Sequence, residues 1–254
     1  MYIEFDDKSP KKEIDFNEIQ PEGFTETVKF SPFTTFNGWT FKNFFSTAKT
    51  PAIHFGGRST TLENFTFVNF YWQPVSSATG NEGGLIYSSS GPVIFKNCRF
   101  SGQIEAIKGK KHFFYSSSIR FNESSLNIIV NSAENFTLFK GDINNSDIIF
   151  DITAPTVTIA DGSARNSRFS GKISSENTVS LCDDGSGYNV YNIITSSLLS
   201  YVSKGISVYN SDISTSSQSD EDMESLGIKF KGCTAEQLKN PTYLYNLRFP
   251  IGVD

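Results

Sequence analysis

Short apolar runs alternate with clusters of Ser, Asn, Gly and Asp over most of the chain. The runs are three to six residues long and rich in Phe, Ile, Val, Tyr and Thr, which suit a pleated, half-buried surface. Apolar runs bounded by such turn formers indicate β-strands. Examples are 53–55, 93–95, 128–130, 147–152 and 156–159. Because residues 1–231 show no clear helical periodicity, the pattern predicts an all-β protein.

One phrase of eight residues occurs twice. Residues 97–104 read Asn-Cys-Arg-Phe-Ser-Gly-Gln-Ile, and residues 166–173 read Asn-Ser-Arg-Phe-Ser-Gly-Lys-Ile, 69 residues later. Looser echoes around an Asn recur with a mean spacing of about 24 residues, which is typical of solenoid repeats. This spacing favours three short strands per turn in a single-stranded parallel β-helix of about eight irregular coils. The alternative for many short strands is a β-sandwich.

The Asn residues shared by these echoes have a candidate structural role. Strands in consecutive coils lie about 4.8 Å apart, so a turn residue lies above its counterpart in the next coil. Asn tolerates the left-handed backbone conformation, and its amide both donates and accepts hydrogen bonds. We therefore predict a structural ladder of Asn97, Asn122, Asn145 and Asn166. The alternative is that each is an unrelated turn residue.

The two ends of the chain depart from the repeat. Residues 1–38 contain more charge and Pro and are predicted to form an N-terminal lead-in and cap, followed by the β-helix at 39–219. Residues 220–254 are predicted to form an acidic loop and a C-terminal cap. The Thr-Ala-Glu-Gln sequence at 234–237 has the form of a capping box, and Pro241 follows, so we expect a short capping helix there.

Composition and charge limit the function classes. The formal net charge of −5 argues against nucleic-acid binding, which needs a basic face. The chain has no run of 18 apolar residues and no signal-peptide pattern, so we expect no membrane insertion and no signal peptide. The three cysteines have neither zinc-site spacing nor a disulfide framework, and we expect no metal and no cofactor. The 24 Phe residues are expected to fill the core with stacked rings.

Two sets of residues are candidates for a functional site. Tyr71 and Trp72 precede a loop predicted at 73–84, where an exposed ring would stack on a sugar; the alternative is that these rings fill the core. Asp183 and Asp184 resemble the Asp-Asp element of polygalacturonases, where paired carboxylates cleave a glycosidic bond. The Asn-Thr-Asp, Gly-His-Gly and Arg-Ile-Lys elements of that family are absent. We therefore predict no catalytic residue, with the two Asp residues as runner-up candidates.

The end of the chain resembles a known group of proteins. Residues 232–243 read Gly-Cys-Thr-Ala-Glu-Gln-Leu-Lys-Asn-Pro-Thr-Tyr, and residues 249–251 read Phe-Pro-Ile. This ending is similar to the tail of β-helical surface proteins with GLUG-type repeats and of phage minor structural proteins from gut Gram-positive hosts. The resemblance implies a non-enzymatic role in adhesion or virion structure.

These observations predict a non-enzymatic structural or surface-binding component of a phage virion, of the tail, fibre or decoration type. The expected partners are other virion proteins, further copies of the chain in a homotrimer, and a cell-surface polysaccharide. One alternative is a polysaccharide-cleaving β-helical enzyme, either a hydrolase or a lyase. The other is a bacterial cell-surface adhesin, located outside the cell or on its surface.

Overall fold

The structure is a computed structural model. It describes residues 2–3, 12–30, 35–49, 51–55, 59–74, 83–88, 91–106, 109, 111–181, 188–195, 198–202 and 206–209. Within these ranges the protein is all-β, with 25 strands in three sheets and one short helix, α1 (Phe16–Ile19). The last part of the predicted β-helix at 210–219 and the acidic loop and cap predicted at 220–254 lie outside the described residues, as do residues 183–187.

Three parallel sheets, here called A, B and C, contain all the described strands. Sheet A comprises β1 (Tyr2–Ile3), β3 (Val28–Phe30), β7 (Ile53–Phe55), β10 (Gly83–Ser88), β13 (Lys111–Tyr115), β16 (Phe136–Phe139), β19 (Thr156–Ala160), β22 (Thr178–Leu181) and β24 (Leu198–Val202). Sheet C comprises β4 (Thr35–Asn37), β8 (Thr60–Glu63), β11 (Val93–Lys96), β14 (Ile119–Asn122), β17 (Asp142–Asn144) and β20 (Ala164–Arg165).

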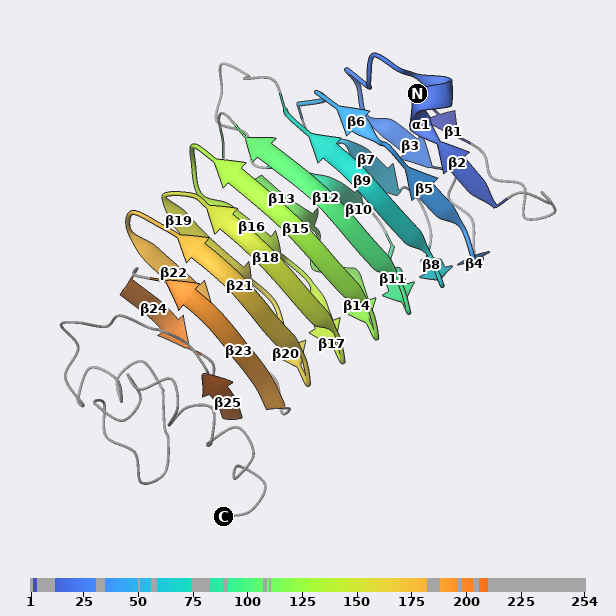
Figure 1. Ribbon diagram of the computed structural model, residues 1–254. Helices are drawn as coiled ribbons and strands as arrows, with labels where there is room; N and C mark the ends of the chain where they lie inside the picture. Colours follow the sequence, from blue (N-terminus) through green and yellow to red (C-terminus); the bar gives the residue numbers. More distant parts are fainter. Residues whose placement is uncertain are drawn as a thin grey trace, which may run out of the picture.

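Sheet B is the largest of the three sheets. It comprises β2 (Glu13–Asp15), β5 (Thr40–Lys42), β9 (Thr66–Trp72), β12 (Arg99–Ala106), β15 (Ser125–Ser132), β18 (Asp147–Thr153), β21 (Arg168–Ser174), β23 (Tyr188–Thr195) and β25 (Ile206–Tyr209), with β6 (Phe45–Ser46) also paired to β9. Its middle strands, seven or eight residues long, are the longest of the described strands and form the broad face visible in Figure 1.

From β7 to β21 the chain visits the sheets in the fixed order A, C, B. β10, β11 and β12 lie in sheets A, C and B, and the next three strands repeat this order, one coil further along the stack (Figure 1). Each strand therefore pairs with the strand one rotation away, and the paired strands are parallel. This arrangement fits a β-helix or solenoid and not a sandwich of antiparallel sheets. β1 to β4 already belong to the three sheets, so the sheets begin before residue 39, within the segment predicted to be a lead-in and cap.

Inward-facing side chains of the three sheets form one continuous core. Phe rings dominate its N-terminal and central parts, as the composition suggested. Phe100 lies at the centre of the largest group, with six ring centroids between 5.1 and 6.1 Å from its own. Such edge-to-face and tilted contacts stabilise a core beyond the area that the rings bury.

The glycine of the twice-repeated phrase has a packing role. Gly102 pairs with Phe70 of the preceding coil, and Gly171 pairs with Phe150 of its preceding coil. A Cβ atom at either glycine would overlap the carbonyl oxygen of the paired Phe, and at Gly102 it would also overlap the Phe70 ring. The phrase therefore recurs because, in both coils, a strand glycine leaves room for a Phe on the neighbouring strand.

Candidate functional site

The turns from sheet C to sheet B contain a column of residues with left-handed backbone. Its members have φ between 49° and 53° and are Asn64, Asn97, Glu123, Asn145 and Asn166. The backbone N–H of Asn97 donates to the carbonyl of Asn122 in the next coil at 3.1 Å, and equivalent bonds repeat at the coils on either side. Asn suits this column because its short polar side chain tolerates the left-handed conformation.

The predicted Asn ladder is shifted by one residue at one coil. Asn97, Asn145 and Asn166 lie in the left-handed column, whereas Asn122 ends β14 and Glu123 takes the turn position. Asn122 instead accepts a side-chain hydrogen bond from Asn144 at 3.2 Å. The side chains of the column are bonded at its N-terminal end, where Nδ2 of Asn97 donates to Oδ1 of Asn64 at 2.5 Å.

A second, buried ladder follows the left-handed column by one residue. The backbone N–H groups of Cys98, Ser124, Ser146 and Ser167 each donate to a side-chain oxygen one coil further on, over 2.9 to 3.2 Å. The last acceptor is Oδ1 of Asn189. Each Ser hydroxyl also donates to a backbone carbonyl two residues earlier in its own coil. This ladder was not predicted, although the recurring pairs Asn-Cys, Glu-Ser and Asn-Ser are its signal in the sequence.

The Ser146→Ala change is expected to lower the free energy of unfolding by about 2 kcal/mol. Ser146 is 3% exposed, so its loss leaves the Ser124 N–H group buried without an acceptor, which costs about 1–3 kcal/mol. Urea denaturation followed by circular dichroism measures the change. Ser101→Ala, at a half-buried outward position on β12, serves as the control and should change stability by less than about 0.5 kcal/mol. If Ser146→Ala lowers the free energy of unfolding no more than this control does, the hydrogen bond of the ladder contributes nothing to stability.

Cys98 is a structural member of this ladder and is expected to be unreactive. Burial raises the pKa of its thiol to about 11, and its sulfur donates to the carbonyl of Leu62 at 3.1 Å. Since the thiolate is the reactive form, alkylation by iodoacetamide at pH 8 should be at least about 100-fold slower in the folded protein than in urea. A variant with Cys182→Ala and Cys233→Ala isolates this thiol. Equal rates in both states would contradict its assignment to the ladder.

A third column of polar side chains marks a bulge in sheet B. Asn43 and Asn69 both have φ of 56° and lie opposite each other in the unbroken register of β5 and β6 with β9. Asn69 is the extra residue of the bulge, because β12 pairs with Val68 and then with Phe70. Nδ2 of Asn69 donates to Oδ1 of Asn43 at 2.6 Å, and Nδ2 of Asn43 donates to the Asp15 carboxylate at 3.0 Å. Asp15 also caps α1 by accepting from the Asn17 N–H. The column links this cap to the bulge at Asn69.

The bulge decides which of the two candidate aromatic residues faces solvent. An extra residue at position 69 reverses the alternation of the strand, so that Phe67, Phe70 and Trp72 all face the core. Trp72 is 0% exposed, and its Nε1–H donates to the Ala48 carbonyl at 2.9 Å. The prediction that Trp72 presents an exposed ring to a sugar is therefore wrong, because this ring fills the core.

Tyr71 lies on the outer face of sheet B, held from two sides. Its ring stacks on Phe45 with a centroid distance of 5.5 Å and an interplanar angle of 17°. Its hydroxyl donates to the Glu105 carboxylate, and this hydrogen bond, with burial, raises the pKa of Tyr71 to about 12. The phenol is therefore protonated at neutral pH and acts as a fixed donor to Glu105.

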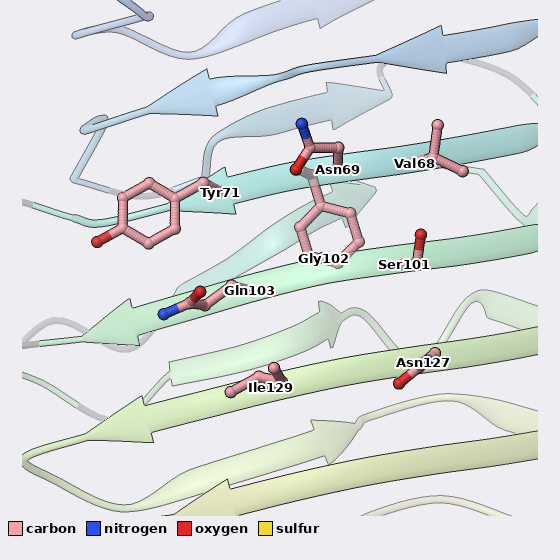
Figure 2. A pocket seen from close by; sticks show the side chains of 9 residues that line it. Val68, Asn69, Tyr71, Ser101, Gly102, Gln103, Asn127 and Ile129 are labelled. Atoms are coloured by element: carbon pink, nitrogen blue, oxygen red, sulfur yellow. The ribbon is translucent and has the colours of Figure 1, made fainter.

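A groove with a volume of about 680 Å³ lies beside Tyr71 on the same face. Figure 2 shows its labelled side chains on three neighbouring strands, β9, β12 and β15. The lining residues share a lack of formal charge and are Val68, Asn69, Phe70, Tyr71, Ser101, Gly102, Gln103, Asn127 and Ile129. Ile129 is 53% exposed, which is unusual for a large apolar side chain. This groove is the candidate binding site of the described structure.

The remaining predictions concern the Asp183–Asp184 pair, metal binding and membrane insertion. Asp183 and Asp184 lie outside the described residues, so the runner-up catalytic pair stays a prediction. Within the described ranges, no group of three or more His, Cys, Asp or Glu side chains is arranged to hold a metal ion. No helix in the described part of the chain is long and apolar enough to cross a membrane.

Comparison with known proteins identifies no relative. No family model, no curated protein and no solved structure matches this chain.

Proposed function

We propose that this protein is a non-enzymatic structural or surface-binding component of a phage particle, of the tail, fibre or decoration type. In this proposal the chain forms a single-stranded parallel β-helix of about eight irregular coils with a short C-terminal capping helix. Copies of it assemble into a homotrimer and contact other virion proteins. The resemblance of residues 232–243 and 249–251 to phage minor structural proteins motivates the particle assignment.

The observation that carries the proposal is the use of polar side chains to join one coil to the next. Three separate columns hydrogen-bond along the stack: the turn column with Asn97, the buried column with Ser146, and the bulge column with Asn69. These bonds run along the axis of the stack, as do the hydrogen bonds of the parallel sheets. Together they favour a stiff rod whose long faces are available for contact. A rod with a groove on its broadest face suits a role in binding rather than turnover.

Two measurements test the proposal. Particles purified from producing cells on a density gradient are expected to contain the protein in a fixed ratio to the capsid protein, whereas an adhesin would appear in the cell-surface fraction. Sedimentation of the purified protein is expected to give the mass of three chains of 28.2 kDa each. A protein absent from particles and present at the cell surface would overturn the virion assignment.

The enzyme alternative has its own test. If Asp183 and Asp184 are a turn, then replacing both with Ala leaves every measured property of the protein unchanged. If they are a catalytic pair, the unmodified protein releases reducing ends from a polysaccharide, or unsaturated products in the case of a lyase, and the double variant does not. Such cleavage would replace the proposed function by the enzymatic one.

A further inference from the structure

The groove on sheet B arises where a bulge ends. β9 contains the extra residue Asn69, which has no partner position in β12. Ser101 of β12 pairs with Val68, and the next residue, Gly102, pairs with Phe70. A bulge bends its strand, so the outer surface is hollowed where the bent strand meets a regular one. Gly102 adds no side chain at this junction, and the inner side of its position is filled by the Phe70 ring. The bulge of the backbone therefore shapes the hollow, and side chains of β9, β12 and β15 line it.

The lining of the groove combines neutral polar side chains with apolar ones in both of its rows. Asn69, Gln103 and Asn127 supply amides, which both donate and accept hydrogen bonds. The half-buried Tyr71 ring and the exposed Ile129 side chain supply apolar surface close to these amides. A ligand that matches this lining carries many hydroxyl groups that donate and accept, together with flat apolar patches of C–H groups.

The charges next to the groove disfavour an anionic ligand. The Glu105 carboxylate is bonded to the Tyr71 hydroxyl, and Asp151 is exposed and paired in register with Ile129. Two carboxylates at the edge of a groove with an uncharged lining repel a phosphate or a uronic acid. Two lysines are also near: Lys172 pairs in register with Asp151 and partly offsets its charge, and Lys42, in register with Val68, is bound to the Glu13 carboxylate at 2.6 Å.

The groove has a direction. Register places its side chains in two rows across the strands, one through Val68, Ser101 and Asn127 and the other through Tyr71, Gln103 and Ile129. Neighbouring strands are about 4.8 Å apart, so a ligand lying along the rod axis meets a new pair of side chains at each step. This geometry favours an elongated chain of repeating units over a compact molecule.

The geometry points to a binding site for a segment of a neutral oligosaccharide, lying across β9, β12 and β15. The apolar face of one sugar ring packs on Tyr71, and hydroxyl groups of the neighbouring units bond the amides of Gln103 and Asn127 (Figure 2). Tyr71 is a rigid platform because Phe45 and Glu105 already hold it. This inference names the ligand class of the surface-binding role and rests on that proposed function.

Calorimetric titration of the purified full chain tests the ligand class. The probes are neutral hexasaccharides (maltohexaose, cellohexaose, laminarihexaose and chitohexaose) and two anionic ones, a hyaluronan hexasaccharide and hexagalacturonate. At least one neutral probe is expected to bind, with each anionic probe at least about tenfold weaker. No binding of any neutral probe, or anionic binding of equal strength, would overturn the inference.

A pair of matched variants tests the place of binding. The double change Gln103→Ala with Asn127→Ala is expected to weaken neutral binding about tenfold, since it removes two hydrogen-bonding groups. The control is Asn131→Ala, at an exposed position on the same strand, β15, outside the groove, which should change affinity less than twofold. Melting curves verify that both variants are folded. Undiminished binding by the double variant would refute this site.

Failure of the groove is distinguishable from failure of the proposed function. If the protein is a particle component whose groove binds no sugar, gradient-purified particles still contain it in its fixed ratio, and only the titrations fail. If the protein binds neutral sugars but is absent from particles, the sugar-binding proposal is supported and the virion proposal is wrong.

Discussion

The Gly171→Ala change is expected to lower the free energy of unfolding by about 4 kcal/mol. Gly171 has φ of +146°, a conformation that costs a residue with a side chain about 1–3 kcal/mol. The new Cβ would also overlap the Phe150 carbonyl oxygen, a backbone atom fixed by the sheet, and overpacking of this kind costs about 1–3 kcal/mol more. Urea denaturation followed by far-ultraviolet circular dichroism measures the loss.

Gly38→Ala provides the matched control for this prediction. Gly38 also has positive φ, +75°, but no atom lies within 4 Å of the place where its Cβ would be. Its replacement should therefore cost only the backbone strain, about 1 kcal/mol. If both changes cost the same, the overlap with Phe150 contributes nothing and the packing explanation of the repeated phrase is incorrect.

The Phe100→Ala change is also expected to cost about 4 kcal/mol. Phe100 is 2% exposed and its ring meets six other Phe rings, so its removal opens a cavity in the most densely aromatic part of the core. Replacing a buried Phe by Ala typically costs about 3–5 kcal/mol. This exceeds the transfer free energy of the lost ring, because the cavity that remains adds its own cost. The same denaturation experiment measures it.

The control for this change keeps most of the volume. Phe100→Leu leaves an apolar side chain in the same pocket and should cost about 1.5 kcal/mol. Because Leu loses the ring contacts but leaves little cavity, the difference between the two variants isolates the cavity contribution. Similar losses for Leu and Ala would mean that the ring contacts, and not the volume, dominate the stability of this region.

The repeat and the strand class were readable from the sequence because they depend on local composition. Runs such as 128–130 and 147–152 are short, apolar and bounded by turn formers, and both lie in strands of sheet B. The spacing of the echoes also indicated three strands per turn, and from β7 to β21 the strands three apart along the chain are paired. The first strands were missed because Glu13–Asp15 and Thr35–Asn37 carry too few apolar residues to stand out from a loop.

The candidate site was much less predictable. Tyr71 and Trp72 are adjacent and chemically similar, and neighbouring strand residues always point to opposite faces. The extra residue at Asn69 decides that Trp72 faces inward and Tyr71 outward. Asn122 was taken for a turn residue because spacing along an irregular repeat does not resolve a shift of one position. The groove is formed by side chains from β9, β12 and β15, which are separated by loops of different length, so that no local pattern indicates it.

Taken by itself, the sequence determined that this chain forms short strands stacked in parallel, because apolar runs, turn residues and a repeat are properties of neighbouring residues. Only the tertiary structure decided register: which residue lies above which, where the bulges fall and so which side chains face outward. Register is set by hydrogen bonds and packing between coils, and a shift of one residue turns a strand's side chains to its opposite face. That is why the buried position of Trp72 and the outer groove beside Tyr71 became visible only in three dimensions.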